Sequence, residues 1–345
     1  MILLVNMMKK KRIEYIDIAK GICILLVVLG HELTWNDALR YFIYSFHIPM
    51  FFALSGMVMV ITHELDLSFD LFLKKNINGI LKPYFQVSII YIIYDLVGGG
   101  TARNIIIEII QTIMGYGINV LWFLSTLFLG KILVWCFYKK IFVKHRKICV
   151  VFAVFCGLVA LEIAEPVTEI FSSNTVGSII GWLFLSLTRP IVAGLFILFG
   201  VYWIKIFEKL KNNPAVQILL ISLLLINIGV MVMKDKITLV NMISNPTYIV
   251  LISGISGTIS VLAISKMDEK HCGARFFGYV GKNSMLIMVT HEYLKIRENV
   301  QDFLSLKINN YIFSITITFI LVLIIEMLIC IIYNKCKKMQ FTNYR

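Results

Sequence analysis

Long runs of apolar residues, separated by short polar segments, repeat along the whole chain. Each run is long enough to cross the roughly 30 Å hydrocarbon core of a bilayer as a helix. A segment in lipid must satisfy its own backbone hydrogen bonds, which a helix does. The pattern therefore predicts an all-α, polytopic membrane protein with about ten transmembrane helices. The predicted helices cover residues 15–34, 41–62, 81–98, 118–138, 147–164, 179–204, 215–233, 247–265, 276–294 and 311–334.

Two segments beside these runs are amphipathic. The first, "FDLFLKKNINGILKPYF", covers 69–85, and the second, "NIIIEIIQTIM", covers 104–114. Such helices can lie in the membrane interface with their apolar face in the lipid. We expect the first at the inner surface and the second in the outer interface, or each as an extension of a neighbouring helix. No repeat or separate soluble domain is visible, so residues 1–345 are predicted to form one integral membrane domain that contains the chemistry.

The composition supports a membrane protein. The 345 residues are 59% hydrophobic and only 15% charged, and their mean hydropathy is +0.85. A soluble globular domain carries about 25% charged residues. We therefore expect a multi-pass protein of the cell membrane, that is, the plasma or inner membrane.

Basic residues are distributed unequally between the two sides of the predicted helices. If both termini are cytoplasmic, 22 of the 33 Lys and Arg residues fall in inner segments, seven in outer segments and four within helices. Cytoplasmic loops retain Lys and Arg, so this topology is the predicted one. The net charge of +13 is mostly this topology signal, with a contribution to binding anionic lipid. It does not indicate nucleic acid as a partner.

The seven cysteines form neither a disulfide framework nor a zinc-binding spacing. None lies in a predicted outer loop, and free cysteines are commonly buried, so we expect them to fill the core. No metal is expected. The seven are Cys23, Cys136, Cys149, Cys156, Cys272, Cys330 and Cys336.

The first predicted helix carries polar residues at bilayer depth. In "KGICILLVVLGH", Lys20 and His31 are eleven positions apart, which on a helix means about 16 Å along the axis and about 20° around it. They therefore share one stripe, and Asp17 lies on the same face. A charge at this depth costs about 2.5–3.5 kcal/mol, so it usually has a task or a partner. The helix runs outward, which puts Lys20 in the inner half and His31 near the outer end.

Three of the six histidines fall at the same outer level. His47 lies within the first two turns of the second predicted helix, where Pro49 is expected to disturb the backbone hydrogen bonds. His291, followed by Glu292, ends the ninth. A lone histidine in a membrane is often only a hydrogen-bonded core residue, but three at one level indicate a site. The remaining three, His63, His145 and His271, lie in basic inner loops and are expected to be solvated.

Trp122 and Asn119 also fall at the outer level, where they can line a sugar site. Packing is the commoner role for a membrane tryptophan, and that alternative stays open for Trp122.

Cations within the helices are predicted in their middle or inner halves. Together they indicate a basic corridor that leads from the cytoplasm to the histidines. The alternatives are that Lys20 or Lys131 snorkels to the headgroups, or that the other two cations pair with Glu162 or Glu326 for structure. The four are Lys20, Lys131, Arg189 and Lys282.

Five stretches, in order, carry a family resemblance: "RIEYIDIAKGICILLVVLGH", "SFHIPMFFALSG", "LKPYF", "LWFLSTLF" and "GKNSMLIMVTH". Together they resemble the acyltransferase-3 family of membrane O-acyltransferases, particularly its single-domain members related to fucose O-acetylases and capsular polysaccharide O-acetyltransferases. The resemblance implies transfer of an acetyl group from cytoplasmic acetyl-CoA to a sugar hydroxyl at the outer face. Some relatives carry a fused extracytoplasmic esterase-like domain; none is expected in this chain, and whether a partner protein completes the transfer stays open.

The resemblance also implies roles for individual residues. His31 matches the essential histidine of the family, and His47 and Pro49 match its second motif. We expect His31 to act as general base on the acceptor hydroxyl or to accept the acyl group briefly itself. His47 is expected to orient His31 or to stabilise the oxyanion.

The remaining candidates bind the donor or the acceptor. Lys20, Lys75 and Lys82 are the first choices for the phosphates of acetyl-CoA, and Arg189 for the donor or its thioester carbonyl. The acceptor site is expected to contain Trp122, Asn119, His291 and Glu292. The acceptor is expected to be capsule or another exopolysaccharide, or its lipid-linked precursor; teichoic acid, peptidoglycan and a succinyl donor are also compatible.

Two other function classes fit part of the pattern. A transporter or flippase for lipid-linked sugars also carries intramembrane charges and broken helices. A catalytically idle member with a structural or sensory role is the third possibility.

Overall fold

The computed structural model of the chain describes residues 12–34, 36–139, 145–171, 175–269, 271, 273–292, 300 and 310–342. Cys272 and residues 293–294, the predicted end of the ninth span, lie outside them. The elements are α2 (Glu14–Glu32), α3 (Ala38–Tyr44), α4 (His47–Ile61), η1 (Glu64–Asp66), α5 (Phe69–Asn76), η2 (Ile77–Leu81), α6 (Lys82–Val97), α7 (Ala102–Ile113), η3 (Asn119–Leu121), α8 (Trp122–Phe137), α9 (Arg146–Ile170), α10 (Thr175–Leu210), α11 (Pro214–Ser222), α12 (Leu224–Met233), β1 (Ile237–Thr238), β2 (Ile243–Ser244), α13 (Ile249–Asp268), α14 (Gly273–Lys282), α15 (Ser284–Thr290) and α17 (Tyr311–Thr342).

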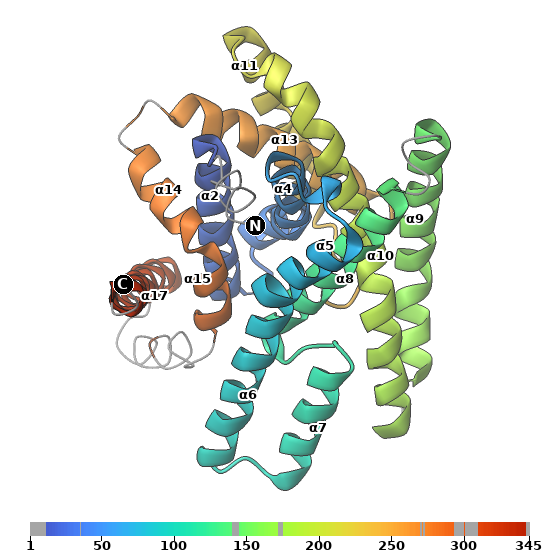
Figure 1. Cartoon of the computed structure of the whole chain (residues 1–345), viewed down its shortest axis with the longest axis vertical. Helices are drawn as coiled ribbons and strands as arrows, with labels where there is room; N and C mark the ends of the chain where they lie inside the picture. The colour runs from blue at the N-terminus through green and yellow to red at the C-terminus, as the bar shows by residue number, and fades with distance from the viewer. Residues whose placement is uncertain are drawn as a thin grey trace.

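The predicted all-α, polytopic architecture is confirmed (Figure 1). Eight helical segments within the described residues are long and apolar enough to cross a membrane. They are Ala38–Ile61, Phe69–Val97, Asn119–Phe137, Lys147–Ile170, Val176–Leu210, Pro214–Met233, Ile249–Asp268 and Tyr311–Lys337. The other two predicted spans are helical but differ from a simple apolar span. The first, α2, carries Glu14, Asp17 and Lys20, and the ninth is divided at Asn283 into α14 and α15.

The two amphipathic segments adopt different structures. Residues 69–85 extend the third span toward its N-terminus through the π-helical turn η2, so the alternative of an extension is the correct one. Residues 104–113 of the second segment belong to α7, a separate helix that packs beside α6 (Figure 1). The turn between α6 and α7 contains Gly99 with φ +85°, and the hydroxyl of Thr101 caps α7 by accepting a hydrogen bond from the backbone N–H of Asn104.

A break between α3 and α4 sets the position of His47. The predicted helix 41–62 is interrupted at Ser45 and Phe46, and α4 begins at His47. Pro49 falls in the first turn of α4, where its missing N–H costs no helical hydrogen bond. The Ser45 carbonyl instead accepts a hydrogen bond of 3.0 Å from the hydroxyl of Ser253 on α13.

Glycines allow the helices to pack with their backbones in contact. A Cβ on Gly281 of α14 would lie 1.7 Å from the carbonyl oxygen of Asp17, and a Cβ on Gly21 of α2 would lie 2.0 Å from that of Phe277. Small residues serve this purpose in membrane helix pairs. The contact presses α14 against α2 (Figure 1) and brings the end of α15 beside the end of α2.

The short strands β1 and β2 pair antiparallel, with Ile237 opposite Ser244 and Thr238 opposite Ile243. This hairpin contacts α3. It therefore lies at the end of the bundle where α2 ends and α4 begins, which we call the histidine end. The opposite end, where α4 ends and η1 lies, we call the lysine end.

Candidate active site

A cavity of about 400 Å³ lies at the histidine end, and we call it the chamber. Its volume falls in the usual range of small-molecule sites, roughly 300–1,000 Å³. The chamber is built from the end of α2, the start of α4, α10, the start of α8 and the loops before η3 and after β1. Six of the predicted site residues line it: His31, His47, Asn119, Trp122, Arg189 and His291.

His31 contacts a carboxylate from a distant part of the sequence, Glu292, which follows α15. Its Nδ1 atom lies 3.3 Å from Oε1 of Glu292, and its ring lies edge-on to that of His291 with centroids 5.1 Å apart. The His31 side chain is 29% exposed and that of Glu292 is 10% exposed. A carboxylate on Nδ1 orients an imidazole and leaves Nε2 as its basic nitrogen.

The other two histidines of the chamber each bind a backbone carbonyl one turn earlier. The Nδ1 of His47 lies 2.8 Å from the carbonyl oxygen of Ile43, and the Nδ1 of His291 lies 2.9 Å from that of Ile287. A carbonyl only accepts hydrogen bonds, so Nδ1 carries the proton in both rings. In its neutral form each ring then has a hydrogen-bond acceptor, not a donor, at Nε2. Both residues are buried.

Arg189 is the deepest cation of the chamber, with 2% of its surface exposed. Its guanidinium donates to the carbonyl of Val240 through Nε (2.8 Å) and Nη2, and to that of Tyr116 through Nη1 (3.0 Å). It also lies over the rings of Tyr116 and Trp122, 4.5 and 5.3 Å from their centroids. Among the described residues, no carboxylate forms an ion pair with it.

This position corrects the prediction that Arg189 belongs to the inner corridor. The position of Arg189 along α10 alone predicts a side chain in the middle or inner half of the membrane. Two loops at the histidine end, which contain Tyr116 and Val240, fold inward and contact this side chain. One of them turns at Gly117 (φ +83°), where a Cβ would lie 2.3 Å from the backbone nitrogen of Trp122. Arg189 forms no ion pair with Glu162 or Glu326; these two carboxylates accept hydrogen bonds from Thr247 and Thr290.

A second cavity, of about 170 Å³, adjoins the chamber, and Lys20 lines it. Phe51, Phe123 and Met288 line both cavities. The order of lining residues along α4 and α8 places the second cavity toward the lysine end. On α8, for example, Trp122 lines the chamber and Leu127, further along the helix, lines the second cavity. Lys20 and His31 therefore face adjoining cavities, as their shared stripe on α2 predicts.

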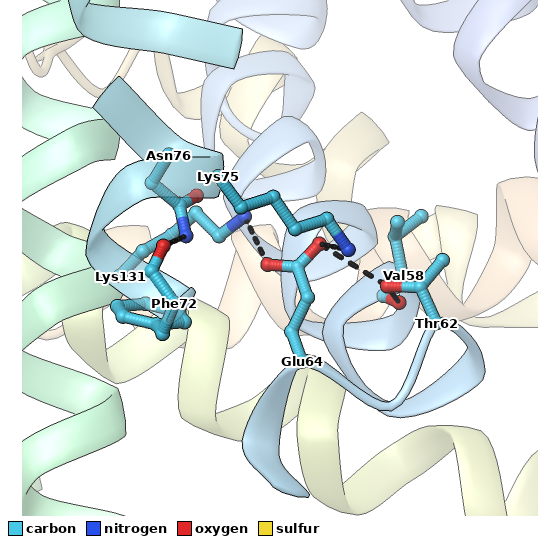
Figure 2. A network of polar contacts seen from close by, with 7 residues as sticks. All are labelled: Val58, Thr62, Glu64, Phe72, Lys75, Asn76 and Lys131. Atoms are coloured by element: carbon cyan, nitrogen blue, oxygen red, sulfur yellow. Dashed lines mark hydrogen bonds and ion pairs between the residues drawn. The ribbon is translucent and has the colours of Figure 1, made fainter. Parts of the chain in front are cut away.

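A buried carboxylate that the sequence analysis did not single out, Glu64, holds two lysines at the lysine end. Figure 2 shows the two ammonium groups on either side of the carboxylate, with Lys75 Nζ 3.0 Å from Oε1 and Lys131 Nζ 2.7 Å from Oε2. The hydroxyl of Thr62 donates to Oε1 at 3.1 Å. Lys131 follows Leu127 by one turn of α8. The cluster of Glu64, Lys75 and Lys131 therefore lies beside the second cavity, on its side toward the lysine end.

Burial and the two neighbouring lysines have opposite effects on the pKa of Glu64. Burial of Glu64 raises its pKa, but the ammonium groups of Lys131 and Lys75 outweigh burial and lower the pKa to about 2. The carboxylate is thus ionised, and the three groups together carry one positive charge. Lys131 thus pairs with Glu64, a partner that is not evident from the sequence.

The remaining lysine candidates are solvent-exposed or lipid-exposed. Lys82, at the start of α6, and Lys282, at the end of α14, are both exposed and line neither cavity. The expectation for the other histidines is confirmed, because His63, His145 and His271 are exposed. The cysteines among the described residues are free; Cys23, Cys149 and Cys330 are buried, whereas Cys336 is exposed.

One group of side chains has a geometry that a metal ion accepts. The possible ligand atoms of His31, His291 and Glu292 all lie within 4.8 Å of one another. Two imidazoles and a carboxylate are a known zinc ligand set. The expectation of a metal-free site therefore stays a prediction.

Arg40 and Tyr44 also line the chamber, although the sequence analysis did not select them. Nη2 of Arg40 donates to the Tyr44 hydroxyl at 2.9 Å, and the ring of Tyr44 lies 4.8 Å from that of His47. The spacing of Arg40, Tyr44 and His47, at intervals of four and three residues, is the sequence feature that places them on one helical face.

Comparison with known proteins gives one finding. A family model described as an acyltransferase domain matches residues 13–333. No curated protein and no solved structure matches the chain.

Proposed function

The chain belongs to the acyltransferase-3 family and is a membrane acyltransferase, and from this premise we propose that it transfers an acetyl group from cytoplasmic acetyl-CoA to a hydroxyl of a cell-surface polysaccharide. The acceptor is capsule or another exopolysaccharide, or its lipid-linked precursor. The protein resides in the cell membrane, with its lysine end in the cytoplasm and its histidine end outside. The excess of Lys and Arg in the predicted inner segments supports this orientation.

One observation carries the proposal: His31, oriented by Glu292, faces a chamber whose wall is shared with the cavity of Lys20. An acceptor that enters from the histidine end and a thioester that enters from the lysine end can meet there. Holding both reactants in one place supplies much of the rate enhancement of such a transfer.

The reaction follows from the two nitrogens of His31. A sugar hydroxyl is a poor nucleophile near neutral pH, and a base with a pKa close to 7 is the usual remedy. Nε2 of His31 takes the hydroxyl proton as the oxygen attacks the thioester carbonyl carbon. The carbon–sulfur bond then breaks, and the thiolate of CoA takes the proton from the imidazolium. Glu292 stabilises that imidazolium through Nδ1, which favours general-base catalysis over a transient acyl-histidine.

Negative charge on the carbonyl oxygen requires a donor, and Arg189 is the better candidate for it. His47 uses its Nδ1 proton on Ile43, so its neutral ring has no donor to direct at an oxyanion. Arg189 carries a fixed positive charge in a buried site, where such a charge acts strongly. His47 instead accepts a hydrogen bond from the acceptor and positions it, with Trp122, Asn119 and His291 completing the sugar site.

The donor binds toward the lysine end. Lys20 lies in the second cavity, and the cluster of Glu64, Lys75 and Lys131 carries one net positive charge beyond it. Phosphate groups of CoA seek such ammonium groups. Lys82, exposed at the start of α6, is available to a phosphate that stays at the surface.

The experiment is an acyl-transfer assay with radiolabelled acetyl-CoA on membranes that contain the protein and the surface glycan of the same cells. Label is expected in the glycan with the wild type and with His63→Gln, a control at an exposed imidazole. His31→Gln is expected to lower the rate at least about 100-fold without loss of the protein from the membrane. Full transfer by His31→Gln would refute the role of His31, and glycan accumulation without label would support a carrier. Proton NMR of glycan from cells with and without the protein identifies the acetylated position.

A further inference from the structure

A third cavity, of about 300 Å³, adjoins the chamber at the histidine end, and we call it the annex. Arg40, Tyr44 and Thr238 line both the annex and the chamber. The annex extends away from them along α3 and the hairpin of β1 and β2, where its wall includes Lys236 and the amide side chains of Asn36 and Asn241. A ligand in the chamber can therefore reach into the annex.

Arg40 is held in place at the boundary of the two cavities. Its guanidinium donates to the carbonyl of Leu33 through Nη1 and to the hydroxyl of Tyr44 through Nη2, and it lies 4.5 Å from the centroid of the Tyr44 ring. A guanidinium fixed in this way loses little conformational entropy when it binds a ligand. Its fork of donors matches a carboxylate or a phosphate.

The annex is positively charged, and the chamber contains two arginines in addition to the carboxylate of Glu292, which lies against His31. Arg40 and Arg189 line the chamber, Arg40 and Lys236 line the annex, and no other Asp or Glu of the described residues lines either one. Asp37, three residues before Arg40, lines neither cavity. Its carboxylate accepts hydrogen bonds from Thr34 and Tyr311. A recess lined by one sign of charge concentrates ligands of the opposite sign.

We propose that the acceptor carries a negatively charged group, a carboxylate or a phosphate, which Arg40 and Lys236 bind in the annex while the reacting hydroxyl lies at His31. The inference rests on the proposed function and specifies its substrate class: a glycan that contains an acidic or phosphorylated sugar. The phosphates of the donor are a poor alternative for the annex, since the annex lies on the opposite side of the chamber from Lys20 and Glu64.

Binding of small probes to the purified full-length protein tests the inference without any need for turnover. The probes are methyl β-glucoside, methyl β-glucuronide and glucose 1-phosphate, followed by saturation-transfer NMR at low and high salt. The variants are Lys236→Gln and Lys236→Glu, with Lys234→Gln as the matched control, because Lys234 is exposed nearby and does not line the annex. Lys236 is exposed, so its substitution is compatible with folding. Arg40→Lys keeps the positive charge but removes the forked donors of the guanidinium, and it is expected to weaken binding of the charged probes.

The two charged probes are expected to bind more tightly than the neutral one. Lys236→Gln should weaken both charged probes about three- to tenfold and Lys236→Glu more, with the neutral probe unchanged. Lys234→Gln should change nothing, and high salt should reduce the preference for charge. A difference between glucuronide and phosphate tells which group the annex prefers.

Three results would overturn the inference: equal binding of charged and neutral probes by the wild type, an equal effect of the Lys234 and Lys236 variants, or displacement of the charged probes by coenzyme A. None of these results affects whether label moves from acetyl-CoA to glycan. Failure of the proposed function shows instead as absence of label transfer in every variant, so the two failures are distinguishable.

Discussion

The Nδ1 atom of His31 lies 3.3 Å from Oε1 of Glu292, which connects the end of α2 to the residue pair that follows α15. Two helices far apart in sequence meet here because glycines let α14 contact the backbone of α2. The pair has the arrangement of a catalytic base and the carboxylate that orients it. We expect the chemistry of the enzyme to depend on this contact.

Glu292→Gln is therefore expected to lower the rate of acyl transfer about 10²- to 10⁴-fold, because the amide does not stabilise the imidazolium of His31. The measurement is label transfer from acetyl-CoA under single-turnover conditions. Glu165→Gln, at an exposed carboxylate of α9, is the control and should be silent. An unchanged rate in Glu292→Gln would show that His31 works without this partner.

Arg189→Lys keeps a positive charge but loses the fork that donates to Val240 and Tyr116. We expect kcat to fall about 10²- to 10³-fold, the usual loss of one oxyanion donor. The KM for the acceptor should change little, since the charge acts mainly in the transition state. Thermal unfolding of the detergent-solubilised variant separates this effect from loss of the two loop contacts. A rise in KM alone, with kcat retained, would assign Arg189 to substrate binding.

Glu64→Gln leaves the ammonium groups of Lys75 and Lys131 without their carboxylate. Removal of one partner from a buried ion pair costs about 3–5 kcal/mol, and we expect the lower part of this range because Lys75 is 26% exposed. Thermal unfolding of the solubilised protein measures the loss. Asp66→Asn is the control, because Asp66 is 76% exposed.

The same variant has a defined pH dependence. The pKa of Glu64 is lowered from its ordinary value of 4.5 to about 2 in the folded protein. A lowered carboxyl pKa adds stability that is complete above pH 4.5 and is lost as the pH falls toward 2. The difference in stability between wild type and Glu64→Gln should thus be constant from pH 7 to 5 and shrink below 4.5. A difference that grows on acidification would contradict the ion-pair assignment.

Removal of metal tests the ligand set of His31, His291 and Glu292. The proposed mechanism uses the imidazole of His31 as a base, and a metal-bound nitrogen cannot accept a proton. Treatment with EDTA or 1,10-phenanthroline is therefore expected to leave acyl transfer unchanged, and elemental analysis of the purified protein should find less than one zinc per chain. Loss of activity that zinc restores would replace the base with a metal centre.

The depth of residues along the helices and the shared face of Lys20 and His31 on α2 are predictable from the sequence, whereas contacts between helices and the placement of loops are not. Helical rise alone places His31, His47 and His291 at one level, and all three line the chamber. The contact between His31 and Glu292 depends on how α14 and α15 pack against α2. The inner position expected for Arg189 is wrong, because the loops that contain Tyr116 and Val240 reach its side chain from the histidine end.

The lysine cluster illustrates the same limit. The position of Lys75 in the chain predicts a cation for the donor, but its carboxylate partner Glu64 lies in η1, and the third member, Lys131, comes from α8. Only the tertiary structure brings these three segments together. Pro49 indicated a disturbed helix, and the actual interruption precedes it at Ser45 and Phe46.

The central claim is that a donor from one side of the membrane reacts with an acceptor on the other. Sealed vesicles test it directly, with the lysine end of the protein outward, radiolabelled acetyl-CoA outside and surface glycan enclosed. The account predicts label on the enclosed glycan with the wild type and none with His31→Gln. Transfer that occurs only when acetyl-CoA and glycan are on the same side of the vesicle would contradict it.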